Sequence, residues 1–158
     1  LATLLHDVED WKTASYKSGL VEKWMKDADV DDNTRKNVNG IVSKISFKGV
    51  SHDDKMDIIE GKIVQDADRL DALGAIGIIR NLSYGAANGI PVYDPKIKPD
   101  PNLPPEKLKR SPSINHFYEK LLLLKDRMNT ETAKKMAEER HEFMELFLKQ
   151  FFKEWGRE

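Results

Sequence analysis

A histidine and an aspartate stand side by side near the start of the chain, His6 and Asp7, directly after the mostly apolar run "LATLL". An imidazole and a carboxylate are both metal ligands, and either can also transfer protons in catalysis. Further along, Asp66, Asp68 and Asp71 lie within "VQDADRLDALGAIG", a stretch otherwise rich in Ala, Leu, Ile and Gly. A carboxylate among such residues is costly to bury unless it is paired or metal-bound. These five residues are the first candidates for a functional site.

The three aspartates of "DADRLD" cannot all serve one ion if the stretch is helical. An α-helix turns about 100° per residue, which separates Asp66 from Asp68 by about 200° and Asp68 from Asp71 by about 60°. Asp66 is therefore expected to face an apolar stripe and to make a buried hydrogen bond or ion pair. The two nearby cations, Arg69 and Arg80, are candidate structural partners of these carboxylates. The apolar stripe is predicted to comprise Ile59, Ile63, Ala67, Leu70 and Leu73.

Helices must position these residues, and the periodicity of apolar residues predicts an all-α fold. The proline-rich segment 84–113 holds all seven prolines and is predicted to be one loop. We expect a single domain over 1–158, with a C-terminal helical pair over 114–155. Asn129 or Thr130 is expected to cap the last helix. Its buried side is predicted to carry Met136, Phe143, Phe147 and Phe151. The remaining helices are predicted from Leu1 to Asp10, from Ser18 to Ala28, from Asp31 or Asp32 to Ile45, and from Met56 to about Leu82.

Composition excludes several function classes. The net charge of −1, with 34% charged residues, provides no basic field for nucleic acid. The absence of cysteine excludes disulfides and thiolate metal sites, and it fits a cytoplasmic protein. The longest purely apolar run, Leu121 to Leu124, is far shorter than the roughly 20 residues that span a bilayer, so no membrane association is expected. The aromatic residues between Phe143 and Trp155 are expected to form core or the interface of a possible homodimer.

The motifs "LLHDVED" and "VQDADRLDALGAIG" together resemble the HD-domain superfamily of metal-dependent phosphohydrolases. The segments "ISFKG", "PVYDP" and "INHFYEKLLLLKDRMNTETAKKMAEERHEFM" extend the resemblance over nearly the whole chain. They are similar to the bacterial stand-alone HD hydrolases of the YedJ type. The resemblance implies an HD-domain helical bundle whose metal ligands are an early histidine, an adjacent His-Asp pair and a distal aspartate.

Carried onto this chain, the resemblance implies that His6, Asp7 and Asp68 bind one metal ion. Imidazole and carboxylate together suit Mn²⁺, Fe²⁺, Co²⁺ or Zn²⁺, and Mg²⁺ less well. The fourth ligand, the family's first histidine, is expected upstream of Leu1, because neither His52 nor His116 matches its place in the pattern.

The reaction implied is hydrolysis of a phosphoester or pyrophosphate bond, with a nucleotide, such as a nucleoside triphosphate, as the expected substrate. Asp10 follows Asp7 by three residues on the same helical face and is the candidate general acid or base. Glu9 faces elsewhere and is expected at the surface. Lys48 is a candidate for neutralising phosphate charge, as is Arg69 or Arg80. The residues expected around the ligands or the substrate are Asp66, Arg69, Asp71, Arg80 and His116.

The alternative function is a catalytically silent HD module that serves regulation or interaction. Metal content and hydrolysis of nucleotides distinguish this module from an enzyme, since the module needs neither.

Overall fold

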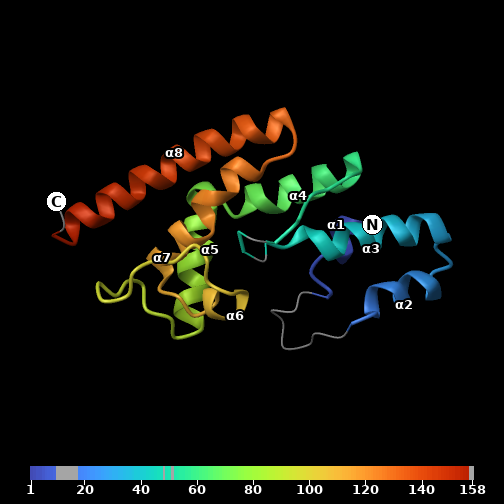
Figure 1. Cartoon of the computed structure of the whole chain (residues 1–158), viewed down its shortest axis with the longest axis horizontal. Coiled ribbons are helices and arrows are strands. Elements are labelled where there is room, and N and C mark those ends of the chain that lie inside the picture. The colour runs from blue at the N-terminus through green and yellow to red at the C-terminus, as the bar shows by residue number, and fades with distance from the viewer. Residues whose placement is uncertain (10–17, 48, 51, 157–158) are drawn as a thin grey trace. The chain divides into compact units, whose positions relative to one another are not determined.

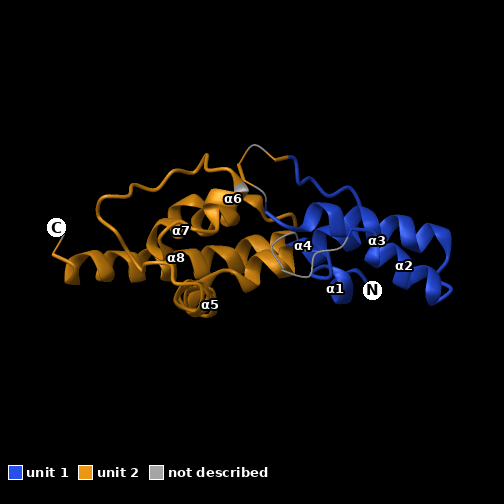
Figure 2. Cartoon of the chain, turned by 90° about the horizontal axis from the view of Figure 1, so that it is seen from below, with its two compact units in different colours: residues 1–47, 53–65 blue, residues 48–52, 66–158 orange. Residues whose placement is uncertain are grey.

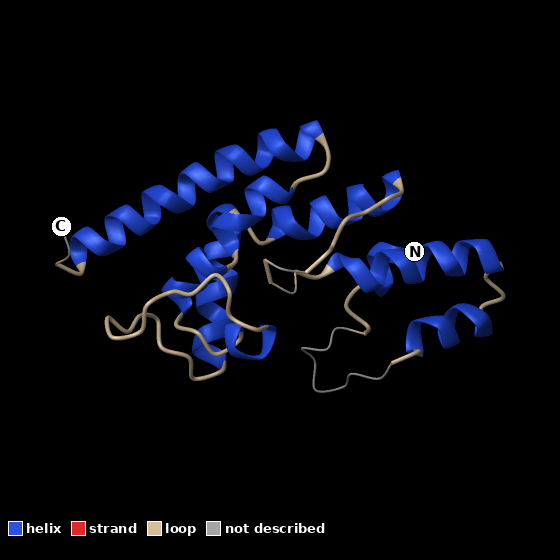
Figure 3. Ribbon diagram, viewed as in Figure 1, coloured by secondary structure: helices blue, strands red, loops and turns tan. Residues whose placement is uncertain are grey.

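The computed structural model describes residues 1–9, 18–47, 49–50 and 52–156 (Figure 1). These residues form helices and connecting loops without a strand, which confirms the predicted all-α class (Figure 3). None of the helices in this part of the chain is both long and apolar enough to cross a bilayer. The elements are α1 (Ala2–Leu5), α2 (Leu20–Asp27), α3 (Asp32–Ile45), α4 (Ile59–Asp71), α5 (Gly74–Ala87), α6 (Pro105–Leu108), α7 (Ser113–Glu119), the 3₁₀ helix η1 (Leu121–Arg127) and α8 (Glu131–Glu154).

The chain divides into two compact units, which Figure 2 distinguishes by colour. Unit 1 comprises residues 1–47 and 53–65, and unit 2 comprises residues 48–52 and 66–158. The division falls inside α4, between Gln65 and Asp66. The first half of this helix therefore belongs to one unit and the second half to the other.

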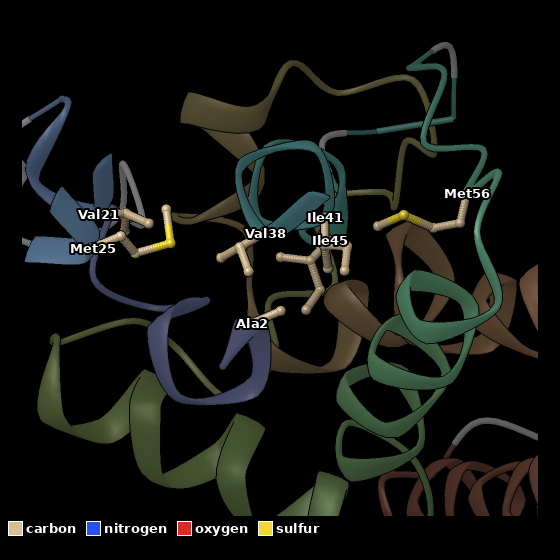
Figure 4. Close-up of a cluster of buried hydrophobic side chains, with 7 residues drawn as sticks. All are labelled: Ala2, Val21, Met25, Val38, Ile41, Ile45 and Met56. Atoms are coloured by element: carbon tan, nitrogen blue, oxygen red, sulfur yellow. The ribbon is translucent and has the colours of Figure 1, made fainter. Parts of the chain in front are cut away.

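Unit 1 is built around α3, against which α1 and α2 pack. The cap predicted for α3 is confirmed at Asp31, whose side chain accepts a hydrogen bond from the Thr34 amide at 3.0 Å. Glu22 of α2 accepts hydrogen bonds from Arg35 Nε at 3.2 Å and Asn39 Nδ2 at 2.7 Å, both on α3. Burial stabilises each large aliphatic side chain of the core by about 1.5–3 kcal/mol. The core comprises Ala2, Val21, Met25, Val38, Ile41, Ile45 and Met56 (Figure 4).

Unit 2 is organised along α8, which packs against α5 and η1. The predicted cap is confirmed at Thr130, whose side chain accepts a hydrogen bond from the Ala133 amide. The predicted buried side of α8 is wrong for Met136 and Phe143, which are 40% and 47% exposed. The residues that α8 buries instead are Ala133, Ala137, Met144 and Leu148.

The aromatic residues of α8 form contacts within unit 2. Phe147 stacks on Phe117 of α7 with ring centroids 5.7 Å apart. Tyr93, from the proline-rich segment, makes edge contacts with three rings near the end of α8. These contacts attach the proline-rich segment to α8, and the three rings are those of Phe151, Phe152 and Trp155.

The helix predicted from Met56 to Leu82 is two helices in the structure. The break follows Asp71, and α5 begins at Gly74, whose φ of +72° lies in the left-handed region that favours glycine. The predicted loop 84–113 contains the end of α5 and the short helix α6. The predicted C-terminal pair consists of three elements, because η1 separates α7 from α8.

Buried polar groups hold the proline-rich segment onto α7. Glu119 is only 1% exposed, and its Oε1 accepts hydrogen bonds from the Asp100 amide at 3.2 Å and from Ser111 Oγ at 2.8 Å. Asn115 Nδ2 donates to the Ile97 carbonyl at 2.9 Å. Among the described residues, Glu119 Oε2 has no hydrogen-bond partner. Burial raises the pKa of Glu119 because an ionised carboxylate loses its hydration there.

Glu119→Gln is expected to remove a pH dependence from the stability of the protein. Because folding raises the pKa of Glu119, the folded state binds this proton more tightly than the unfolded state does. The contribution of Glu119 to the free energy of unfolding is therefore greatest when the pH is below its pKa in the unfolded state. This contribution is lost as the pH rises through its pKa in the folded state. Urea unfolding of both proteins between about pH 5 and pH 8 should show the wild type losing stability relative to the variant. The assignment is contradicted if the stability of the wild type relative to the variant stays constant or rises with pH. Glu142→Gln, at an exposed position of α8, is the control.

Candidate metal centre

The His6–Asp7 pair lies at the C-terminal end of α1, in unit 1. His6 Nδ1 lies 2.8 Å from the carbonyl oxygen of Thr3, one turn earlier. His6 Nε2 lies 3.3 Å from Asp7 Oδ2. The imidazole is half-buried, whereas the Asp7 side chain is exposed. The pair therefore presents one ring nitrogen and one carboxylate oxygen side by side.

The chemistry of this pair fits a divalent metal ion. A carbonyl oxygen only accepts hydrogen bonds, so His6 Nδ1 must donate, and the neutral ring then has its lone pair on Nε2. Nε2 lies 3.3 Å from Asp7 Oδ2, so one cation can bind to both atoms. A histidine that donates its other ring N–H to a backbone carbonyl is the usual arrangement of a metal-ligating histidine.

Glu9 supports the turn that follows the pair. Its Oε1 accepts a hydrogen bond from the Val21 amide at 2.8 Å, in the first turn of α2. Gly19, the N-cap residue of α2, provides no side-chain cap, so Glu9 satisfies a helix amide that would otherwise lack a partner of this kind. Glu9, expected at the surface, is half-buried, because its carboxylate caps a helix that begins eleven residues later in the sequence.

Asp66 anchors α4 in unit 2. Its Oδ1 accepts hydrogen bonds from the Asn129 amide at 2.7 Å and from Asn129 Nδ2 at 2.9 Å. Its Oδ2 accepts from the Thr130 amide and from Thr130 Oγ1, both at 2.8 Å. The carboxylate is 3% exposed, so these four donors replace its hydration. The predicted buried hydrogen bond of Asp66 is confirmed, and it joins α4 to the N-terminus of α8.

Asp68 lies on the opposite side of α4 from Asp66 and is exposed. The prediction of an apolar inner stripe is wrong for Ile59 and Ile63, which are 56% and 55% exposed. The buried face of α4 instead includes Gln65, whose Nε2 donates to the carbonyls of Lys44 and Asp54 at 2.9 and 2.8 Å. Polar residues occupy this face because hydrogen bonds from their side chains offset the cost of burial.

The cations near Asp68 have different surroundings. Arg69 is 3% exposed and donates from Nη1 to the Arg127 carbonyl, so its guanidinium is engaged inside unit 2. Arg80 of α5 is exposed and forms an ion pair with Asp71, the last residue of α4. Of these two arginines, Arg80 is the one that a phosphate in solution can reach. His116 is half-buried in α7.

The candidate ligands are divided between the units. His6 and Asp7 belong to unit 1, and Asp68 belongs to unit 2. In the part of the chain that the structure describes, no three His, Cys, Asp or Glu side chains form a group that could hold a metal ion. The assembly of these three ligands into one site stays a prediction. Asp10 and Lys48 lie outside the described residues.

An open hollow of about 270 Å³ lies beside α1 in unit 1. Apolar side chains such as Ile41 and Val64 form most of its wall, together with polar groups from Thr34, Asn37 and Glu60. Thr3 also lines it, and the carbonyl of the same residue accepts the hydrogen bond from His6. The predicted site residues that the structure describes are not in its lining.

The described part of the chain is helical and carries an adjacent His-Asp pair and a later, exposed aspartate. These are the features of a helical protein with candidate metal ligands. No family model matches the chain. The YpgQ protein of Bacillus subtilis (strain 168) is 37% identical over 157 residues, which cover 97% of this chain and 70% of YpgQ. A crystal structure of YpgQ in complex with ADP is similar, with a TM-score of 0.73 and 35% identity over 97% of this chain and 71% of that chain.

Two further crystal structures are similar to the chain. An HD-superfamily hydrolase from Bacillus thuringiensis is 48% identical, with a TM-score of 0.67, and the match covers 99% of this chain and 72% of that one. A protein from Lactobacillus plantarum is 38% identical, with a TM-score of 0.88, covering 98% and 74%. The chain belongs to the HD superfamily of hydrolases. Its membership of the YedJ-type group stays a prediction.

Proposed function

We propose that this chain is a metal-dependent phosphohydrolase that acts on a nucleotide. The observation that carries the proposal is the His6–Asp7 pair, in which the Thr3 carbonyl fixes Nδ1 as a donor and leaves Nε2 to face the carboxylate. Membership of the HD superfamily supports the hydrolase activity. The YpgQ complex with ADP supports a nucleotide as the substrate, because the match to YpgQ covers nearly all of this chain.

In this proposal, His6, Asp7 and Asp68 hold one divalent metal ion, with Mn²⁺, Fe²⁺, Co²⁺ or Zn²⁺ suited better than Mg²⁺. When bound, the ion supplies a Lewis acid that activates a water and polarises a phosphoryl oxygen. Thr3 keeps the imidazole in the tautomer that binds metal. Asp10 transfers the proton between the water or leaving group and solvent.

The charge that develops on the phosphate oxygens needs nearby cations, and Arg80 and Lys48 are the proposed ones. Arg80 is exposed and held at one end by Asp71, which restricts its position without burying it. Arg69 is better suited to support α4 than to bind phosphate, because its guanidinium is buried against the Arg127 carbonyl. His116 has no assigned role in this proposal.

The full-length protein, with the segment that precedes Leu1, is expected to bind about one transition metal ion and to release phosphate or pyrophosphate from a nucleotide. Metal analysis after dialysis measures the stoichiometry, and a panel of nucleoside mono-, di- and triphosphates with Mn²⁺, Co²⁺, Zn²⁺ or Mg²⁺ measures turnover. Addition of a chelator should abolish turnover, and readdition of the metal should restore it. His52→Asn, an exposed loop histidine, is the matched control that should keep both properties.

The second candidate function is a regulatory or interaction module of the HD fold. A full-length protein that binds no metal and hydrolyses no phosphoester of the panel would support this module and contradict the enzyme. The cytoplasmic location, the single domain and the homodimer stay predictions.

A further inference from the structure

One arginine of α8 closes the corner between α4 and α5. Arg140 donates a hydrogen bond from Nη1 to the carbonyl of Leu70, in the last turn of α4. The carbon atoms of its side chain lie over Gly74, where an added Cβ would come within 3.1 Å of Arg140 Cγ. Gly74 also has a φ of +72°, so the corner needs glycine for its backbone and for the approach of Arg140.

The corner carries three of the residues proposed for the site. Asp68 and Asp71 lie in the last turn of α4, about 60° apart around the helix. Arg80, on α5, forms an ion pair with Asp71 across the corner. The angle between α4 and α5 therefore determines where the Arg80 guanidinium lies relative to Asp68.

Arginine suits this position for two reasons. The last carbonyl groups of a helix carry partial negative charge, so a cation beside them is favourable. The Leu70 carbonyl accepts a hydrogen bond from the Leu73 amide at 3.1 Å, and Arg140 adds a charged donor to the same oxygen. The planar guanidinium has several donors in fixed directions, and its long apolar stem packs on the glycine. Arg69, in the same turn of α4, donates to the Arg127 carbonyl and so attaches this turn to η1.

We propose that Arg140 is a positioning residue for the candidate metal site. It holds the Leu70 carbonyl and packs on Gly74, and it thereby fixes the corner that presents Asp68 and the Asp71–Arg80 pair. The contacts that define this role are to the backbone of the corner, so Arg140 acts through α4 and α5. The proposal rests on the proposed function of Asp68 and Arg80.

Arg140→Met keeps the apolar stem and removes the donor and the charge. We expect its affinity for Mn²⁺ to fall by about 10–100-fold, the usual effect of losing a residue that supports a metal ligand. The amides of Ala72 and Leu73, which donate to the Arg69 and Leu70 carbonyls, should exchange with solvent faster than in the wild type, with or without metal. Arg140→Lys should recover part of the affinity because it restores a donor and a charge. Lys149→Met, at an exposed position of α8, is the control that should leave both measurements unchanged.

The outcomes separate this role from simple stabilisation and from failure of the proposed function. A folded Arg140→Met variant with wild-type Mn²⁺ affinity overturns the proposal, even if its unfolding midpoint in urea is lower. Unchanged amide exchange at Ala72 and Leu73 overturns it as well. If the wild-type chain itself binds no Mn²⁺, the proposed function fails and the positioning role falls with it. The exchange measurement then still shows whether Arg140 holds the corner.

Discussion

Asp68→Asn is expected to abolish metal binding and metal-dependent hydrolysis. The substitution keeps the size of the side chain but removes the charge that a divalent ion needs, and loss of a direct ligand should exceed the roughly 10–100-fold cost of losing a supporting residue. Asp68 is exposed on the face of α4 opposite the buried anchor Asp66. The free energy of unfolding without metal should therefore stay unchanged or rise slightly, since repulsion from Asp71 on the same helix face is relieved.

Calorimetric titration with Mn²⁺ and urea unfolding in a chelator test these two expectations on the same sample. Asp126→Asn, an exposed aspartate at the end of η1, is the matched control and should retain wild-type affinity and stability. A variant at Asp68 that still binds Mn²⁺ with wild-type affinity would remove this residue from the ligand set.

Asp66→Asn is expected to have the opposite profile, with a loss of about 1–3 kcal/mol in the free energy of unfolding. The carboxylate accepts four hydrogen bonds from Asn129 and Thr130. An asparagine provides one acceptor oxygen and turns an NH₂ group toward donors that it cannot satisfy. Metal affinity should change only through the altered position of α4.

Urea unfolding of Asp66→Asn and Asp68→Asn, each with and without Mn²⁺, compares the two aspartates directly. If Asp66→Asn loses the metal and Asp68→Asn only lowers the stability, the ligand assignment is displaced by two residues and the buried face of α4 carries the site. Thr130→Val offers a second test of the anchor, because it removes one of the four donors together with the side-chain cap of α8 and should also lower the free energy of unfolding.

Local signals in the sequence were sufficient for much of the fold. Asp31 and Thr130 cap the helices that periodicity predicts after them, because a cap depends on residues within one turn. The break before Gly74 was not predictable in this way. The left-handed backbone of Gly74 goes together with the packing of Arg140, which is 66 residues later in the sequence. A glycine alone does not mark a break, because Gly77 lies inside α5.

In the candidate site, too, local features were predictable and contacts between distant residues were not. Helix geometry alone separated Asp66 from Asp68 and predicted a buried hydrogen bond for Asp66, which the structure confirms. The identity of its donors required knowledge of which helix packs on which, and a single sequence does not contain it. The stripe of Ile59 and Ile63 was misassigned for a related reason, since apolar character indicates burial only when a partner element covers that face.

The anchor at Asp66 also constrains the order in which the chain folds. Its donors at Asn129 and Thr130 are 63 and 64 residues further along, so a growing chain presents the aspartate long before it presents its partners. Until those residues leave the ribosome, the second half of α4 cannot bury Asp66 without stranding a charge, and hydration of the carboxylate opposes early collapse. Closing this contact is a non-local step of the kind that slows folding. The start of α8 must therefore emerge from the ribosome before the second half of α4 can reach its native environment.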